Sequence, residues 1–255
     1  MKRFILIAVF VVAALYPAEI IFAQWQQLPG KAQSVSAGAD GSLWIIGMNN
    51  SPYFWDEDEY EWVQISGTAQ KIAITPDGTP VVINQRNEIY VRRGDNWERM
   101  PGSATEISIG ANGDKWILGT NQTPYKWDPE SGRWQEFSGT AVRIAADQGG
   151  RPWLVNRRNE IFRQRGRSWE RMPGSAQDIE AGADGTVFII GSNTRLYKWD
   201  EEEYQWDEYF DREHNYRIAV TANGRPVVIE CEIVYNEYGL QDEEKCSNGI
   251  VKGMR

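Results

Sequence analysis

The side chains best suited to binding a ligand in this sequence are the amides and guanidinium groups of two polar turns. The turn at residues 84–88 reads Asn-Gln-Arg-Asn-Glu, and the turn at residues 156–160 reads Asn-Arg-Arg-Asn-Glu. An aromatic residue follows each turn, Tyr90 or Phe162. Planar polar groups beside an aromatic ring suit the vicinal hydroxyls and the C–H face of a sugar. The candidate glycan-binding residues of these turns are Asn84, Arg86, Asn87, Asn156, Arg158 and Asn159.

A second set of turns has a Gly-x-Asn pattern, with a tyrosine four residues after the asparagine. If all these turns lie on one rim of a ring, they form several similar sites, and the molecule binds its ligand multivalently. The alternative is that the Asn and Arg side chains only cap strand ends and pair with Glu88 or Glu160 across neighbouring units. The sequence leaves both interpretations open. The asparagine and tyrosine pairs are Asn49 and Tyr53, Asn121 and Tyr125, and Asn193 and Tyr197.

Catalysis is the weaker interpretation, because few groups in the chain are placed to be activated. The sole histidine, His214, lies in the polar stretch 211–215, which we expect to be a solvated loop. The Asp-Gly turns lack the spacing of the Asp boxes of propeller sialidases, and no pair of acids is singled out for glycoside hydrolysis. The Asp-Gly turns also lack the dense oxygen ligands of a calcium loop. We expect no catalytic residue, no metal and no cofactor.

The charge of the chain argues against nucleic acid as a partner. Without residues 1–23 the chain has 25 basic and 35 acidic residues, a net charge of −10. A phosphate backbone is bound by clustered Lys and Arg, whereas the charge runs at 56–59 and 201–203 are acidic. We therefore expect neither nucleic acid nor an anionic membrane surface as a partner.

Residues 1–23 have the pattern of a secretory signal peptide. Two basic residues precede the apolar run 4–16, and Ala23 offers a small residue at the cleavage position. The run is shorter than the roughly 20 residues needed to span a membrane. We expect a mature chain that starts at Gln24, that is secreted (or periplasmic in a bacterium), and that is not inserted in a membrane. An uncleaved N-terminal anchor is the alternative.

A repeat of about 36 residues organises the rest of the chain. Tryptophans open repeats near residues 25, 62, 97, 134, 169 and 206, at alternating intervals of 37 and 35 residues. Pro-Gly follows the leading Trp in the odd repeats and Ser-Gly in the even ones, so a two-repeat unit of 72 residues has been duplicated. The sixth repeat has diverged. A fixed period of this length is typical of solenoids and propellers.

Each repeat divides into short strands at a hairpin dipeptide that favours positive φ. Apolar and small residues alternate before the dipeptide, as at 72–74, and a continuous apolar run follows it, as at 44–46. An aromatic strand such as 53–55 comes next, and the leading Trp of the next repeat opens a fourth. The dipeptides are Asp40-Gly41, Asp77-Gly78, Asn112-Gly113, Gly149-Gly150, Asp184-Gly185 and Asn223-Gly224.

Four short strands per repeat and no helical segment predict an all-β fold, a six-bladed β-propeller of four-stranded antiparallel blades over residues 24–239. An open solenoid is the alternative. In the sixth repeat we expect strands at 216–221, 226–230 and 232–238 but no fourth strand. The strand at Trp25 therefore pairs with this last blade and closes the ring, which removes exposed sheet edges.

The two cysteines, Cys231 and Cys246, lie beyond the last well-formed repeat. In an exported chain they favour a disulfide. Such a bond would tether the C-terminal tail, residues 240–255, to the closing blade. Two free thiols or half of a metal site are the alternatives, and with one histidine in the chain a zinc site lacks ligands.

The order of Trp, Pro-Gly or Ser-Gly, Ala, an apolar strand, and Asp-Gly before Trp-Ile or Val-Asn resembles the tectonin repeat. The resemblance covers residues 24–239, and the sixth repeat departs from it by two extra residues before Ile218 and a shortened turn after Glu230. Similar proteins include tectonins, fish-egg lectins and a horseshoe-crab plasma lectin. The resemblance implies a six-bladed propeller that binds sugars, among them bacterial lipopolysaccharide or other surface polysaccharide and O-methylated glycans.

We therefore expect a secreted, multivalent carbohydrate-binding protein, a lectin that is not an enzyme. A non-enzymatic platform for protein–protein interaction, or a structural secreted propeller, is the alternative. We expect the leading tryptophans to pack in the core between blades rather than to form sugar platforms. The shortened turn at 230–232 has lost the Asn and Arg, so we expect no such site in the sixth blade.

Overall fold

The computed structural model describes residues 25–210, 215–235 and 241–254. These residues form strands, turns and loops and no helix. The described part of the chain accordingly contains no helix that is long and apolar enough to cross a membrane. The predicted signal peptide and His214 lie outside the described residues.

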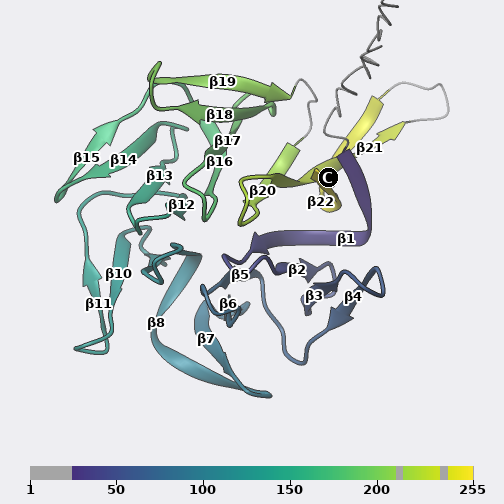
Figure 1. Ribbon diagram of the computed structural model, residues 1–255, viewed down its shortest axis with the longest axis horizontal. Helices are drawn as coiled ribbons and strands as arrows, with labels where there is room; N and C mark the ends of the chain where they lie inside the picture. Colours follow the sequence, from purple (N-terminus) through teal and green to yellow (C-terminus); the bar gives the residue numbers. More distant parts are fainter. Residues whose placement is uncertain (1–24, 211–214, 236–240, 255) are drawn as a thin grey trace, which may run out of the picture.

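The strands form four-stranded antiparallel units arranged around a common centre (Figure 1). This confirms the expected all-β class and the four-stranded antiparallel sheets. Unit 1 comprises β1 (Trp25–Ala37), β2 (Leu43–Gly47), β3 (Pro52–Asp56) and β4 (Glu61–Gln64). Unit 2 comprises β5 (Lys71–Ile74), β6 (Pro80–Ile83), β7 (Glu88–Arg93) and the first half of β8 (Asn96–Ile109). Unit 3 comprises the second half of β8, β9 (Lys115–Gly119), β10 (Pro124–Asp128) and β11 (Arg133–Glu136).

The remaining strands form units 4 to 6 in the same way. Two long strands, β1 and β8, each belong to two units, so that the described strands make two seven-stranded and two four-stranded sheets. Unit 4 comprises β12 (Arg143–Ala146), β13 (Pro152–Val155), β14 (Ile161–Arg165) and β15 (Ser168–Arg171). Unit 5 comprises β16 (Ala176–Ala181), β17 (Val187–Gly191), β18 (Leu196–Asp200) and β19 (Gln205–Phe210). Unit 6 comprises β20 (Asn215–Val220), β21 (Pro226–Tyr235), β22 (Gln241–Met254) and the first half of β1.

The hairpin turns lie where the sequence predicts them. Each joins the innermost strand of a unit to the next strand, and the glycine of every predicted dipeptide adopts a positive φ, which a residue without Cβ reaches at little cost. The glycines are Gly41 (91°), Gly78 (82°), Gly113 (88°), Gly150 (76°), Gly185 (92°) and Gly224 (75°).

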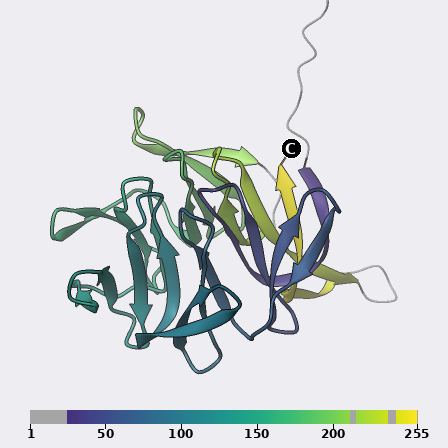
Figure 2. The same ribbon diagram turned by 60° about the horizontal axis from the view of Figure 1, so that its bottom comes forward.

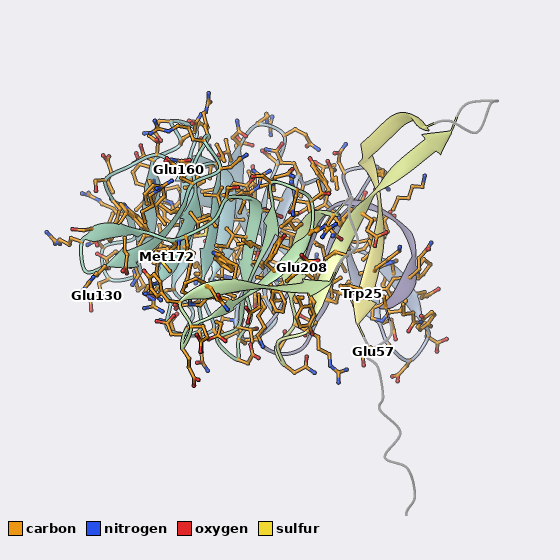
Figure 3. The ribbon with its side chains drawn as sticks, turned by 90° about the horizontal axis from the view of Figure 1, so that it is seen from above. Trp25, Glu57, Glu130, Glu160, Met172 and Glu208 are labelled. Atoms are coloured by element: carbon orange, nitrogen blue, oxygen red, sulfur yellow. The ribbon has the colours of Figure 1, made fainter. Side chains whose placement is uncertain are left out.

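The structure corrects the expected third strand of the last unit. Residues 226–235 form one continuous strand, β21, and the third strand is β22, which lies in the stretch expected to be a C-terminal tail. β22, the yellow strand in Figure 2, pairs with β21 on one side and with β1, the purple strand, on the other. Trp25 of β1 lies opposite Met254 of β22. The N-terminal strand thus shares a sheet with β20 and β21 as expected, but through β22. Figure 3 shows Trp25 next to this strand.

The two cysteines lie in these paired strands. Glu232 of β21 pairs with Lys245 of β22. Cys231 directly precedes Glu232, and Cys246 directly follows Lys245. The side chains of both cysteines are outside those that the structure describes, so the disulfide stays a prediction.

The hydrophobic core lies between successive units rather than in one central cluster. The strands after the hairpin turns are buried along their length, as in the run Val187–Gly191, and their side chains pack on the neighbouring sheet. One cluster joins units 4 and 5 through Trp153 and Ile189, and another joins units 6 and 1 through Ile229 and Val35. Face-to-face burial of this kind stabilises adjacent sheets by about 25 cal/mol per Å² of apolar surface.

A ring of polar side chains lies on the innermost strands, around a small central cavity of about 40 Å³. Each member stands nine residues after the leading Trp of its repeat, or eleven in the divergent last repeat. We call this set the central ring: Ser34, Lys71, Glu106, Arg143, Asp178 and Arg217. Glu180, two residues beyond Asp178, lines the same cavity, and its burial raises its pKa to about 8, with the neighbouring carboxylates of Asp178 and Glu106 acting in the same direction.

Removal of residues 241–255 tests the role of β22. The deletion strips the pairing partner from both β21 and the first half of β1, and it takes Val251 out of the hydrophobic cluster that holds Ile229 and Val35. We expect the truncated chain to be insoluble or to unfold roughly 10 °C or more below the full chain, because open strand edges and uncovered apolar surface favour aggregation and the lost contacts amount to several kcal/mol. Thermal unfolding followed by circular dichroism measures this, and an unchanged melting temperature would contradict a structural role for β22.

Glu180 gives the fold a pH dependence that can be isolated by substitution. Its pKa is about 8 in the folded chain, raised from its ordinary value of 4.5, which it keeps in the unfolded chain. Between these values the folded state keeps a proton that the unfolded state has lost, so the free energy of unfolding falls as pH rises through this window. The contribution is fully present below the unfolded pKa. In the Glu180→Gln variant this fall in the free energy of unfolding with rising pH is absent.

We therefore expect the parent chain to lose stability relative to Glu180→Gln from about pH 5 to about pH 8, by about 1 kcal/mol per pH unit. Urea unfolding of both proteins at several pH values in this range gives the difference directly, because the titration of all other groups cancels. A difference that stays constant with pH would show that Glu180 titrates normally.

Candidate functional site

Three equivalent open pockets lie on units 1, 3 and 5, which derive from the odd repeats. Their volumes are about 510, 350 and 500 Å³, within the range of small-ligand sites. Each has a buried isoleucine as its floor, a tryptophan as a wall, and an asparagine and tyrosine pair at its rim. We call them the odd pockets. The corresponding residues are Ile45, Trp62, Asn49 and Tyr53 in unit 1, Ile117, Trp134, Asn121 and Tyr125 in unit 3, and Ile189, Trp206, Asn193 and Tyr197 in unit 5.

The tryptophan wall is held in place by a hydrogen bond and by a second indole. In unit 3, Trp134 Nε1 donates to the carbonyl oxygen of Pro101 at 2.8 Å, and the Trp134 ring packs edge-on against Trp127, with centroids 5.0 Å apart. Units 1 and 5 repeat both contacts. Edge-to-face aromatic pairs contribute about 0.5–1.5 kcal/mol each beyond their buried area, so the wall is rigid before any ligand binds.

The asparagine and tyrosine pair is preorganised in the same way. Asn49 Nδ2 donates to Tyr53 Oη at 2.8 Å, and Asn49 Oδ1 accepts the backbone N–H of Ser51 at 3.1 Å. The Asn121 and Asn193 side chains donate to Tyr125 and Tyr197 in the same manner. Each asparagine thus lies in contact with its tyrosine, and these bonds are exposed to solvent.

A glycine before each of these turns leaves room for the tyrosine ring and the asparagine side chain that line the pocket. A Cβ added at Gly119 would lie 2.9 Å from Tyr125 Cε2 and 2.7 Å from Asn121 Oδ1. Gly47 and Gly191 have the same surroundings. The glycine is therefore required by the close approach of the tyrosine ring, and not by the local φ.

In the even repeats an asparagine replaces this glycine and narrows the pocket. Asn84 occupies the position of Gly47, and the equivalent cavity in unit 2, lined by Asn84, Tyr90 and Trp97, measures about 210 Å³. Asn84 Oδ1 accepts the backbone N–H of Arg86 and of Glu88, and Nδ2 donates to Glu88 Oε2 at 2.8 Å. Asn156 makes the same three bonds with Arg158 and Glu160.

The two candidate arginines of the even turns also have partners in their own hairpins. Arg86 lies 3.1 Å from Glu88, and Arg158 lies 3.3 Å from Glu160, with both guanidinium groups mostly exposed. Asn87 and Asn159 adopt φ values of 62° and 61°, a conformation that asparagine tolerates better than most residues. These ion pairs form within one hairpin and not between units.

The carboxylates of these turns are stabilised in their charged form. The amide of Asn84 holds the pKa of Glu88 below its usual range, with Arg86 and Arg99 acting in the same direction. Asn156 lowers the pKa of Glu160 likewise, helped by Arg158 and Arg171. The even turns are thus self-satisfied polar clusters, whereas the odd turns present an open pocket.

The leading tryptophans were expected in the core, and the structure gives several of them a place at a pocket as well. Trp62, Trp134 and Trp206 are half-buried, pack on the hydrophobic clusters, and also line the odd pockets. Trp97 packs on a cluster and lines the smaller cavity of unit 2 in the same way, so the Gly-x-Asn turn distinguishes the wider pockets and not the tryptophans. The linings of the odd pockets differ in side-chain type at one equivalent position, which holds Lys31, Ser103 or Ser175.

No group of three or more His, Cys, Asp or Glu side chains within the described residues is placed to hold a metal ion. The groups that line the odd pockets offer apolar contact with indole and isoleucine, and hydrogen bonding through amide, phenol and backbone groups. That combination suits a neutral, hydroxyl-rich ligand.

Replacing Trp134 by Phe tests the bond that fixes the pocket wall. We expect the free energy of unfolding to fall by about 1 kcal/mol through loss of the bond to Pro101, which lowers the melting temperature by about 2–4 °C. Trp169→Phe is the matched comparison in an even repeat, and we expect it to lower the free energy of unfolding by a similar amount, because Trp169 Nε1 makes the same bond to Ser138. A Trp134→Phe variant as stable as the parent would show that the bond contributes nothing.

The comparisons with known proteins agree with this repeat architecture. A family model described as the tectonin domain matches the chain twice, over residues 68–153 and 140–220. Together the two matches extend from residue 68 to residue 220, more than half of the 255 residues. No curated protein matches the chain.

Proposed function

Because the chain belongs to the tectonin domain family, we propose that it is a non-enzymatic, multivalent carbohydrate-binding protein whose sugars occupy the three odd pockets. The observation that carries the proposal is the recurrence of one preformed pocket, with an indole wall and an asparagine and tyrosine rim, on alternate units. An aromatic wall suits the C–H face of a pyranose, and the rim suits its hydroxyls.

The proposed architecture is a closed six-bladed propeller. Two observations support it: β1 pairs with β22 in the last unit, and a hydrophobic cluster joins unit 6 to unit 1 as others join successive units. In such a ring the odd pockets lie on alternate units, and the narrower pocket of unit 2 lies between two of them. Three similar sites on one rigid body bind a repetitive glycan surface far more tightly than one site does.

The proposed setting is extracellular or periplasmic. The pattern of residues 1–23 supports export, and Cys231 and Cys246, which adjoin a backbone pair of β21 and β22, support a disulfide there. The ligands that such a protein meets include bacterial lipopolysaccharide and other surface polysaccharides, and O-methylated sugars are further candidates. The acidic net charge disfavours nucleic acid.

A glycan array probed with residues 24–255 tests the proposal, and the pocket glycines supply the sharpest variants. We expect the parent to bind a subset of glycans, and a triple variant Gly47→Ala, Gly119→Ala and Gly191→Ala to bind roughly tenfold more weakly or worse. The added methyl groups displace the tyrosine and asparagine of each odd pocket. The single variant Gly119→Ala should lose less, because two sites remain.

The matched control is the double variant Arg86→Ala and Arg158→Ala, which changes exposed side chains of the even turns. We expect it to keep glycan binding and to shift the melting temperature by little, since exposed ion pairs contribute about 0–1 kcal/mol. Binding lost in this variant and kept in the glycine variant would move the site to the even turns. A parent that binds no glycan but captures a protein would replace the lectin by an interaction platform.

A further inference from the structure

The central ring alternates in charge around the cavity, with one exception. In chain order its members are Ser34, Lys71, Glu106, Arg143, Asp178 and Arg217. Lys71 Nζ lies 2.6 Å from Glu106, and Arg143 lies 3.0 Å from Glu106 and 2.9 Å from Asp178. Continued alternation would place an acid at position 34, between Arg217 and Lys71, but the residue there is a serine.

Two arginines at equivalent ring positions show what the serine changes. Arg143 donates from Nη1 to the carbonyl oxygen of the preceding residue, Val142, and Arg217 donates from Nη1 to that of Tyr216 in the same way. The Nε atoms of both arginines are buried and form no hydrogen bond with the residues that the structure describes. Arg143 Nε nevertheless faces a carboxylate, because it lies 2.9 Å from Asp178 Oδ1 of the next ring position. The ring position after Arg217 is Ser34.

The charge of the ring leaves a cation uncompensated at this point. The described residues of the ring supply three cations against the carboxylates of Glu106 and Asp178, and burial keeps Glu180 mostly protonated at neutral pH. Burial also lowers the pKa of Lys71, and the positive charges of Arg217 and Arg143 add to that effect. An uncompensated cation in a cavity with little water is costly, and an anion would offset that cost.

We propose that Arg217, Ser34 and Lys71 bind a small monovalent inorganic anion of the size of chloride or bromide in the central cavity. The buried Nε–H of Arg217 and the hydroxyl of Ser34 are the donors, and Lys71 adds positive charge. The cavity, at about 40 Å³, has room for such an ion and not for a sugar. The anion completes the alternating ring and so stabilises the fold, independently of any ligand in the odd pockets.

Thermal unfolding at constant ionic strength tests this, with sodium chloride or bromide replacing sodium gluconate, whose anion is too large for the cavity. We expect the melting temperature of the parent to rise saturably, by about 3–6 °C once chloride is about tenfold above its Kd. Arg217→Gln should lose this rise. Ser34→Asp should lose it too and should melt in gluconate at least as high as the parent in saturating chloride, because the added carboxylate takes the place of the ion.

Arg133→Gln is the matched control, because it removes one positive charge from an exposed position at the start of β11, and it should keep the full response. Equal melting of the parent in chloride and gluconate would overturn the proposal, as would a chloride response that persists unchanged in Arg217→Gln and Ser34→Asp. Crystals grown in sodium bromide give a second measurement that does not depend on the variants folding. An anomalous peak beside Arg217 Nε supports the site, and its absence overturns it.

Discussion

The hydrogen bond from the leading tryptophan of each repeat after the first to a backbone carbonyl about one repeat earlier is the contact on which the rest of the structure depends. It joins Trp62 to Pro29, Trp97 to Ser66 and, in the later units, three more such pairs. The bond ties the outermost strand of a unit to the segment that enters its innermost strand. A glycine follows each acceptor with positive φ, and at Gly67 an added Cβ would lie 2.8 Å from Trp97 Nε1. The Pro-Gly and Ser-Gly motifs are therefore explained by the approach of the indole.

Much of the fold could be predicted from the sequence because its strongest signals are local. Hairpin dipeptides such as Asp40-Gly41 constrain φ within two residues, and continuous apolar runs indicate strands buried on both faces. β22 was missed because the stretch 241–248 is almost entirely polar, so it has neither apolar alternation nor a turn signal. Its strand conformation comes from pairing with β21 and β1, and β1 is distant in the sequence.

The site was predictable in part. The Gly-x-Asn turns and their tyrosines lie together as expected, since four residues separate them in one hairpin. In the even turns Arg86 and Arg158 pair with Glu88 and Glu160 as the alternative interpretation has it, but within a hairpin and not across neighbouring units. Glycan binding by the even turns stays a prediction. The pocket wall at Trp134 and the central ring were not foreseen. Members of the ring stand about one repeat apart in the chain, and only the packing of successive units shows which side chains share a surface.

Glycine and asparagine alternate at one turn position, where the residue affects the size of the pocket but not the fold of the chain. Gly47 and Asn84 stand at the same place in adjacent units, and both turns keep the same backbone bond from this residue's N–H to the carbonyl four residues on. The residue at this position can therefore change the size of a unit's pocket while the strands, the indole contacts and the packing between sheets stay as they are. Duplication of the first two repeats adds one wide pocket and one narrow one, so the number of wide pockets and the stability of the scaffold depend on separate residues.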